Sequence, residues 1–98
     1  MCKKYNVLLI CDEVQTGFGR TGKMFGFEHE NVRPDLVCLG KALSGGFMPV
    51  SAVLGNNEVM DQISPGEHGS TFGGNPLGAR TVMAAIDVVI EEKLCENS

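Results

Sequence analysis

Two short, uninterrupted apolar runs place the strongest limit on the fold of this chain. Residues 7–11 read Val-Leu-Leu-Ile-Cys and residues 36–39 read Leu-Val-Cys-Leu, with no alternation of apolar and polar positions. Such runs of β-forming residues are typical of strands that are covered on both faces, as in a parallel sheet. The two runs therefore favour an α/β layer over a helical bundle or an all-β sandwich.

The central part of the chain predicts a third strand and a first helix. We expect the strand over residues 47–54 and a short helix over residues 57–63. Residues 64–74 contain one proline and four glycines, so we expect a loop there.

A long helix should follow this loop. Asn75 supplies an N-cap and Pro76 a first-turn proline, and the helix should run to about Leu94. Residues 81–90 are apolar at all but two positions, so most of the circumference of the helix needs cover. A chain of 98 residues rarely offers that much cover, and we therefore expect a central piece of a larger sheet.

Composition narrows the class of partner and the compartment. Eight basic against twelve acidic residues give a formal net charge of -4, which argues against nucleic acid. The run at residues 7–11 is too short to span a membrane or to direct export. The four cysteines lie far apart with no metal-ligand spacing, so we expect no metal and reduced thiols. These features fit the cytoplasm, or the mitochondrial matrix if a transit segment has been lost.

Each apolar run is followed by a residue that can carry chemistry. Asp12 closes the first run, and Lys41 follows Gly40 at the end of the second. Open parallel sheets bind ligands beyond the carboxyl ends of their strands, so in neighbouring strands both side chains would enter one crevice. Each residue alone is also typical of a solvated strand end. The glycines around Lys41 favour the crevice, because they let backbone and ligand approach closely.

A lysine in a dry crevice opposite a carboxylate suits carbonyl chemistry. Desolvation favours the neutral amine, which can form a Schiff base. Pyridoxal phosphate uses this pair of groups: its aldehyde takes the lysine, and an acidic residue keeps the pyridine nitrogen protonated so that the ring accepts electrons. The pair of Asp12 and Lys41 therefore makes this cofactor a candidate.

Two segments could bind a phosphate. Residues 68–76 offer the hydroxyls of Ser70 and Thr71 before a helix N-terminus, where N–H groups attract anions, although such a loop is also typical of a simple turn. Residues 17–22 match the letters of G-x-G-x-x-G. This pattern indicates dinucleotide binding when it joins a strand directly to a helix. Here residues 12–16 intervene and a poor helix former follows, so we discard the dinucleotide hypothesis.

These segments together closely resemble the class III pyridoxal-phosphate aminotransferases. The resemblance is collinear and is carried by residues 12–17, 19–23, 33–35, 40–46, 68–71 and 73–76. Within the class, Gly40, Ser44 and residues 49–53 and 65–68 are similar to the ornithine aminotransferases. The resemblance implies an α/β fold: a partial sheet of the large domain of a fold type I aminotransferase that ends in a long helix.

The resemblance implies roles for four residues around the cofactor ring. Lys41 would be the catalytic lysine, which forms the Schiff base and moves a proton between substrate carbon and cofactor carbon. Asp12 would pair with the pyridine nitrogen. Val14 would lie against one face of the ring, and Gln15 would reach its phenolic oxygen.

The resemblance also implies a homodimer with shared active sites. Thr71 would bind the phosphate of the neighbouring subunit's cofactor, and Ser70 would lie near the substrate. The implied reaction transfers the δ-amino group of ornithine to 2-oxoglutarate, giving glutamate semialdehyde and glutamate. Acetylornithine or 4-aminobutyrate as amino donor remains an alternative.

The family chain is several-fold longer, so the resemblance makes residues 1–98 a central fragment of the large domain, without the N-terminal part and the C-terminal domain. The missing parts include a glycine loop for the phosphate, an aromatic residue on the ring and a carboxylate-binding arginine. We therefore expect little or no turnover from these residues alone. A truncated, non-catalytic paralogue or a gene fragment is the alternative.

Overall fold

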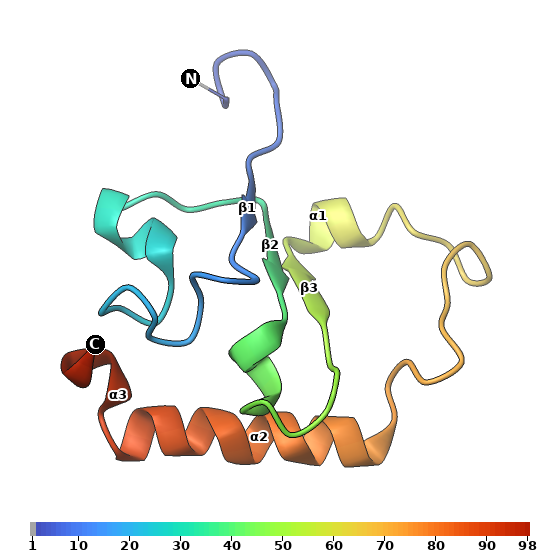
Figure 1. The fold of residues 1–98 in the computed structure, drawn as a ribbon. Helices are drawn as coiled ribbons and strands as arrows, with labels where there is room; N and C mark the ends of the chain where they lie inside the picture. The colour runs from blue at the N-terminus through green and yellow to red at the C-terminus, as the bar shows by residue number, and fades with distance from the viewer. Residues whose placement is uncertain (1) are drawn as a thin grey trace.

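The computed structural model describes residues 2–98 and contains a three-stranded sheet with a long helix crossing below it (Figure 1). The strands are β1 (Ile10–Asp12), β2 (Leu36–Leu39) and β3 (Ala52–Gly55), in the order β1-β2-β3. β1 pairs with β2 in parallel, whereas β3 is antiparallel to β2. The parallel arrangement that the apolar runs favoured therefore holds for the first pair of strands only.

β1 is shorter than predicted and lies closer to the C-terminus. The predicted strand over residues 7–11 is replaced by Ile10–Asp12, because the backbone before it bonds elsewhere. The Asp35 carboxylate accepts the Leu9 N–H at 2.8 Å, and the Val7 N–H turns back to the Cys2 carbonyl at 2.8 Å. The side chain of Val7 is 55 % exposed, so the cover that the apolar run predicts is absent from the described residues.

β3 begins five residues later than predicted, at Ala52 instead of Phe47. The preceding segment, residues 48–51, does not join the ladder. Pro49 in it has no N–H to donate, and the Met48 carbonyl accepts the hydroxyl of the buried Ser44 at 2.5 Å. This segment therefore packs on the turn after β2 instead of pairing as a strand.

Five helical segments complete the described chain, and two of the predicted helices are too long. The 3-10 helices are η1 (Gly26–Glu30) and η2 (Lys41–Ser44); the α-helices are α1 (Asn57–Met60), α2 (Pro76–Glu91) and α3 (Leu94–Asn97). α1 ends at Met60, three residues before the predicted end at Ile63.

The start of α2 confirms the predicted cap, and its end corrects the predicted length. The Asn75 Oδ1 atom accepts the Gly78 N–H at 2.7 Å, and Pro76 is the first helical residue. The helix stops at Glu91 because Lys93 adopts a left-handed backbone with φ of 52°, after which α3 begins. The predicted single helix to Leu94 is therefore two helices.

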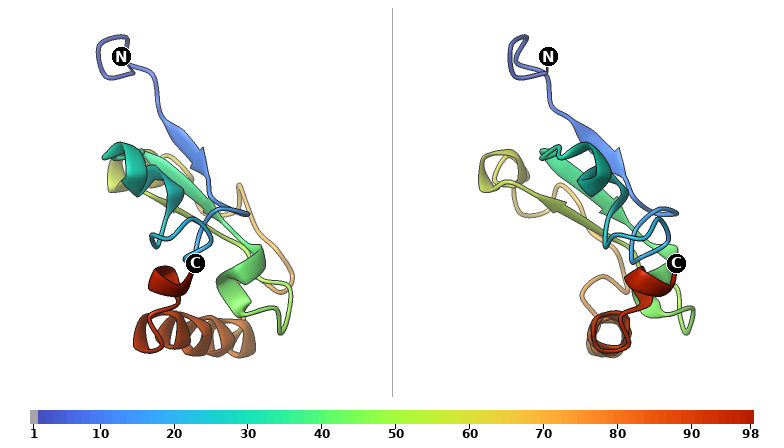
Figure 2. Two further views of the ribbon diagram at one scale, coloured as in Figure 1. Left: turned by 60° about the vertical axis from the view of Figure 1, so that its left-hand side comes forward. Right: turned by 90° about the vertical axis from the view of Figure 1, so that its left-hand side faces the viewer.

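Little apolar surface is buried within residues 2–98. Leu39 and Leu43 are the large apolar side chains that are buried, and α2 leaves Met83, Val88 and Ile90 between 44 and 59 % exposed. The accessible surface is 7544 Å², against about 5,400 Å² for a compact monomer of this mass. The molecule is a slab of 40 × 36 × 17 Å, with the N-terminal strand and α2 at opposite ends (Figure 2). None of the helices in residues 2–98 combines the length and apolarity needed to cross a membrane.

Candidate active site

Asp12 and Lys41 lie at the carboxyl ends of two neighbouring parallel strands, but both residues are exposed and do not share the dry crevice that the sequence predicts. Asp12 is the last residue of β1 and pairs in register with Cys38 of the parallel neighbour β2. The Glu13 N–H donates to the Cys38 carbonyl at 2.9 Å, which extends the ladder one residue past β1. Lys41 begins η2 after a single residue, Gly40, beyond the end of β2. Register therefore places the two residues at the same end of the sheet, where the Asp12 Oδ1 atom accepts the Val14 N–H at 3.1 Å.

The Lys41 side chain meets the loop that follows β1. Its Nζ atom donates to the Gln15 Oε1 atom at 3.1 Å. The Lys41 backbone has φ of 43°, a left-handed conformation that a residue with a side chain seldom adopts. Before it, Gly40 is buried, and a Cβ atom there would lie 3.4 Å from Val14 Cγ1. The backbone of β2 therefore passes close to the Val14 side chain and then turns sharply at the lysine.

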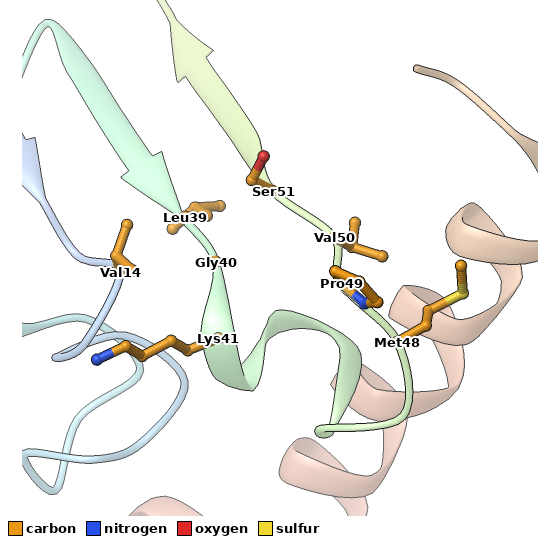
Figure 3. Close-up of a pocket in the computed structure, with 8 residues that line it drawn as sticks. All are labelled: Val14, Leu39, Gly40, Lys41, Met48, Pro49, Val50 and Ser51. Atoms are coloured by element: carbon orange, nitrogen blue, oxygen red, sulfur yellow. The ribbon is translucent and has the colours of Figure 1, made fainter. Parts of the chain in front are cut away.

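A pocket of about 430 Å³ opens beside Lys41 (Figure 3). The Lys41 side chain extends away from Met48 and Val50, toward the loop after β1, and Val14 reaches the same pocket from that loop. The lining residues are Val14, Leu39, Gly40, Lys41, Met48, Pro49, Val50 and Ser51. Of the six predicted site residues, Lys41 and Val14 line this pocket, Gln15 contacts the Lys41 amine, and Asp12 lines neither cavity.

Glu13 is a buried residue of this edge for which the sequence predicts no role. Its side chain is 4 % exposed, and its carboxylate accepts the Thr16 hydroxyl at 2.6 Å and the N–H groups of Gly26 and Phe27 at 2.8 and 2.9 Å. Burial by itself raises the pKa of Glu13, but these three hydrogen bonds outweigh burial and hold the pKa below its ordinary value. Burial, and secondly the Glu13 charge, raises the pKa of the Cys11 thiol.

Ser70 and Thr71 do not join the Lys41 edge. Both lie in residues 61–74, which are exposed throughout and form the long outer loop of Figure 1. Ser70 lines a second cavity of about 730 Å³, together with His68 and Phe72, whereas Thr71 lines neither cavity. At the helix N-terminus beyond them, the Gly78 N–H is already bonded to the Asn75 side chain. The phosphate role of Thr71 concerns the cofactor of a neighbouring subunit, and it stays a prediction.

Residues 17–22 form turns and do not connect a strand to a helix. They begin five residues after Asp12 and are followed by the 3-10 helix η1 at Gly26. Position 19 lies against α3, because a Cβ atom at Gly19 would lie 3.1 Å from the Cys95 sulfur. The four cysteines are free, and residues 2–98 hold no group of three or more side chains suited to a metal ion.

Comparison with known sequences identifies the family of this chain. A family model described as "Aminotransferase class-III" matches residues 1–98. The probable mitochondrial ornithine aminotransferase of Caenorhabditis elegans is 64 % identical over all of this chain, which covers 23 % of that protein. The chain thus spans about a quarter of the length of this relative.

Solved structures share the fold. An acetylornithine aminotransferase from Elizabethkingia anophelis has a TM-score of 0.94 and 66 % identity, over 97 % of this chain and 24 % of its own. An ornithine aminotransferase from Toxoplasma gondii has a TM-score of 0.95 and 52 % identity, over 97 % of this chain and 22 % of its own, and PLP partly occupies its active site. This chain belongs to the class III aminotransferase family.

Proposed function

We propose that this chain is the central part, residues 1–98, of the large domain of an aminotransferase that uses pyridoxal phosphate and moves the δ-amino group of ornithine to 2-oxoglutarate. The observation that carries the proposal is the 3.1 Å contact of the Lys41 amine with the Gln15 amide, at the edge where β1 ends in Asp12. In this proposal the N-terminal part and the C-terminal domain of the enzyme lie outside these residues.

The donor groups at this edge fit the ring end of pyridoxal phosphate. That ring needs an amine for its aldehyde and a carboxylate for its nitrogen, and Lys41 and Asp12 supply these two groups. Gln15 supplies an amide beside the amine, and Val14 an apolar surface in the same pocket. These groups account for the ring only, because neither Ser70 nor Thr71 lines the Lys41 pocket and Thr71 is assigned to the phosphate of a partner subunit.

Each of these residues has a separate task in the proposed reaction. When bound, the cofactor supplies an electron sink for the negative charge that develops on the substrate carbon. Lys41 Nζ takes the proton from that carbon and later returns one, and the Gln15 Oε1 atom orients the amine. The Asp12 carboxylate stabilises positive charge at the ring nitrogen, and Val14 limits water at one face of the ring.

Substrates and assembly are part of the same proposal. Ornithine as donor is supported by the names of the relatives, and 2-oxoglutarate is the acceptor that the family resemblance implies. Acetylornithine is a second candidate donor because the E. anophelis enzyme shares 66 % identity. We place Thr71 at the phosphate of a partner subunit in a homodimer and Ser70 near the substrate. The proposed compartment is the cytoplasm or the mitochondrial matrix, and the C. elegans relative is described as mitochondrial.

An exchange enzyme tests the proposal with this chain's own residues. In it, the 98 residues replace the matching segment of the E. anophelis enzyme, which shares the fold. We expect it to retain pyridoxal phosphate through gel filtration and to transaminate acetylornithine. Lys41→Ala should lower turnover by about 10²–10⁴-fold or more, because the proton-transfer group is lost.

The matched control is Lys23→Ala, which removes an exposed lysine outside the pocket and should leave turnover unchanged. Equal turnover of the Lys41→Ala variant and the parent exchange enzyme would rule out the assigned role of Lys41. The 98 residues alone should show little or no turnover. Sequencing the transcript past both ends, followed by donor screening of the complete protein, separates ornithine from acetylornithine and both from a non-catalytic gene fragment.

A further inference from the structure

We propose that Glu13 is a positioning residue of the Lys41 site: its buried carboxylate holds the turn between Asp12 and Gln15, and this turn sets the Gln15 amide on the Lys41 amine. The inference rests on the proposed function, because it assigns Glu13 a part in cofactor binding and transamination. It concerns a residue that lines neither cavity and lies between residues that we place at the cofactor.

The backbone of Glu13 ties the turn to the sheet. Its N–H donates to the Cys38 carbonyl of β2, and its carbonyl accepts the Gly17 N–H, both at 2.9 Å. A Cβ atom at Gly17 would lie 2.8 Å from that carbonyl oxygen, so a side chain at position 17 would break this contact. Residues 14–16, including Gln15, are therefore held at both ends by one residue.

The carboxylate of Glu13 ties the same turn to η1. Oε2 accepts both the Thr16 hydroxyl at 2.6 Å and the Gly26 N–H at 2.8 Å, and Oε1 accepts the Phe27 N–H at 2.9 Å. The backbone of Gly26 approaches closely, because a Cβ atom there would lie 3.2 Å from Oε1. One carboxylate thus joins the turn after β1 to a segment ten residues further along the chain.

Both carboxylate oxygens are needed as acceptors. In a Glu13→Gln variant the amide nitrogen would face either the Gly26 N–H or the Phe27 N–H, and a backbone donor cannot reverse its direction. The Thr16 hydroxyl alone can rotate to suit the change. The variant therefore keeps the shape of the side chain but loses at least one hydrogen bond in a buried place, which frees the turn that carries Gln15.

The exchange enzyme with bound pyridoxal phosphate tests this inference through a double-mutant cycle. We expect Glu13→Gln to weaken cofactor binding about 10-fold, by moving Gln15. It should also shift the pH midpoint of the cofactor absorbance in the same direction as Gln15→Ala. The double variant should bind the cofactor at most about 2-fold more weakly than Gln15→Ala alone, because both changes remove the same interaction.

Glu30→Gln is the control, since it removes an exposed carboxylate at the end of η1, and it should change neither quantity. A lowered melting temperature with an unchanged pH midpoint, or losses that multiply in the double variant, would overturn the inference and leave Glu13 a purely structural residue. If Glu13→Gln does not fold, Thr16→Val removes one donor to Oε2 and should shift the midpoint by a smaller amount in the same direction.

A second readout separates this inference from the proposed function. Amide hydrogen exchange at Gly26 and Phe27 should accelerate at least 10-fold in Glu13→Gln and stay unchanged in Glu30→Gln, with or without cofactor. Failure of the unchanged exchange enzyme to bind pyridoxal phosphate would reject the proposed function. Unchanged amide exchange in Glu13→Gln would reject the positioning role, whatever the cofactor does.

Discussion

The loop after β1 and the loop before α2 have the same number of glycines but differ in burial and in hydrogen bonding. Residues 13–30 and residues 61–75 each contain four glycines. The first loop folds around the buried Glu13 carboxylate, whereas residues 61–74 are exposed and make short-range bonds, such as the Ser64 N–H to the Glu67 carboxylate at 2.8 Å. Glycine is compatible with both arrangements. The difference is the buried Glu13 carboxylate, which accepts hydrogen bonds from the first loop. The first loop presents Gln15 to Lys41, whereas residues 61–74 remain exposed.

Asp12→Asn gives the largest expected effect on the ordered side of this comparison. The amide keeps the size of the side chain but removes the negative charge that would stabilise the ring nitrogen. In the exchange enzyme we expect transamination to fall about 10²–10³-fold, while retention of the cofactor falls far less. Steady-state kinetics and cofactor titration measure the two losses, and similar losses in both would reject the proposed task of Asp12.

Thr71→Ala examines the exposed loop and should have a smaller effect. Loss of one phosphate hydrogen bond should weaken cofactor binding about 10-fold. If Thr71 serves the partner subunit, a mixed dimer of Lys41→Ala and Thr71→Ala chains regains one complete site, with the affinity and half the turnover of the unchanged dimer. If Thr71 serves its own subunit, no complete site forms, and that result would remove the contrast between the two loops.

Acidification should destabilise the loop around Glu13, and this is the smallest of the expected effects. The folded state lowers the pKa of Glu13, so its stabilising contribution is complete above the unfolded value of about 4.3 and is lost as the pH falls through the lower folded value. The charge of neighbouring Asp12 opposes this shift. The protection factors for amide exchange at Gly26 and Phe27, which correct for the intrinsic pH dependence of exchange, should fall below about pH 4.3 in the unsubstituted protein. The Glu13→Gln variant should lack this step; a step of equal size in the variant would assign it to another group.

The parts of the fold that follow from local patterns could be predicted from the sequence. β2 has its predicted bounds, and Asn75 caps α2 as expected, because both depend on a few adjacent residues. β1 and β3 were misplaced, since their limits depend on distant groups: the Asp35 carboxylate takes the Leu9 N–H, and the Ser44 hydroxyl bonds to the Met48 carbonyl. The antiparallel direction of β3 depends on the turn after β2, which the apolar pattern does not describe.

The candidate site likewise contains residues that could be predicted from the sequence and one that could not. The positions of Asp12 and Lys41 near the ends of neighbouring strands could be predicted, because both residues come at or just after the end of an apolar run and β1 and β2 are parallel. Glu13 was missed because its partners at Gly26 and Phe27 lie thirteen and fourteen positions away and donate through the backbone, which carries no residue identity. The available signal was an acidic residue within a glycine-containing segment that has no basic residue before Arg20. Sequence patterns detect side-chain chemistry more readily than a side chain that binds backbone.

The left-handed backbone at Lys41 has a consequence for the stability of the fold. A non-glycine residue in that conformation is disfavoured by roughly 1–2 kcal/mol, and glycine would relieve the penalty. The proposed catalytic role of Lys41 therefore implies that the amine is kept at this position at a cost in folding free energy.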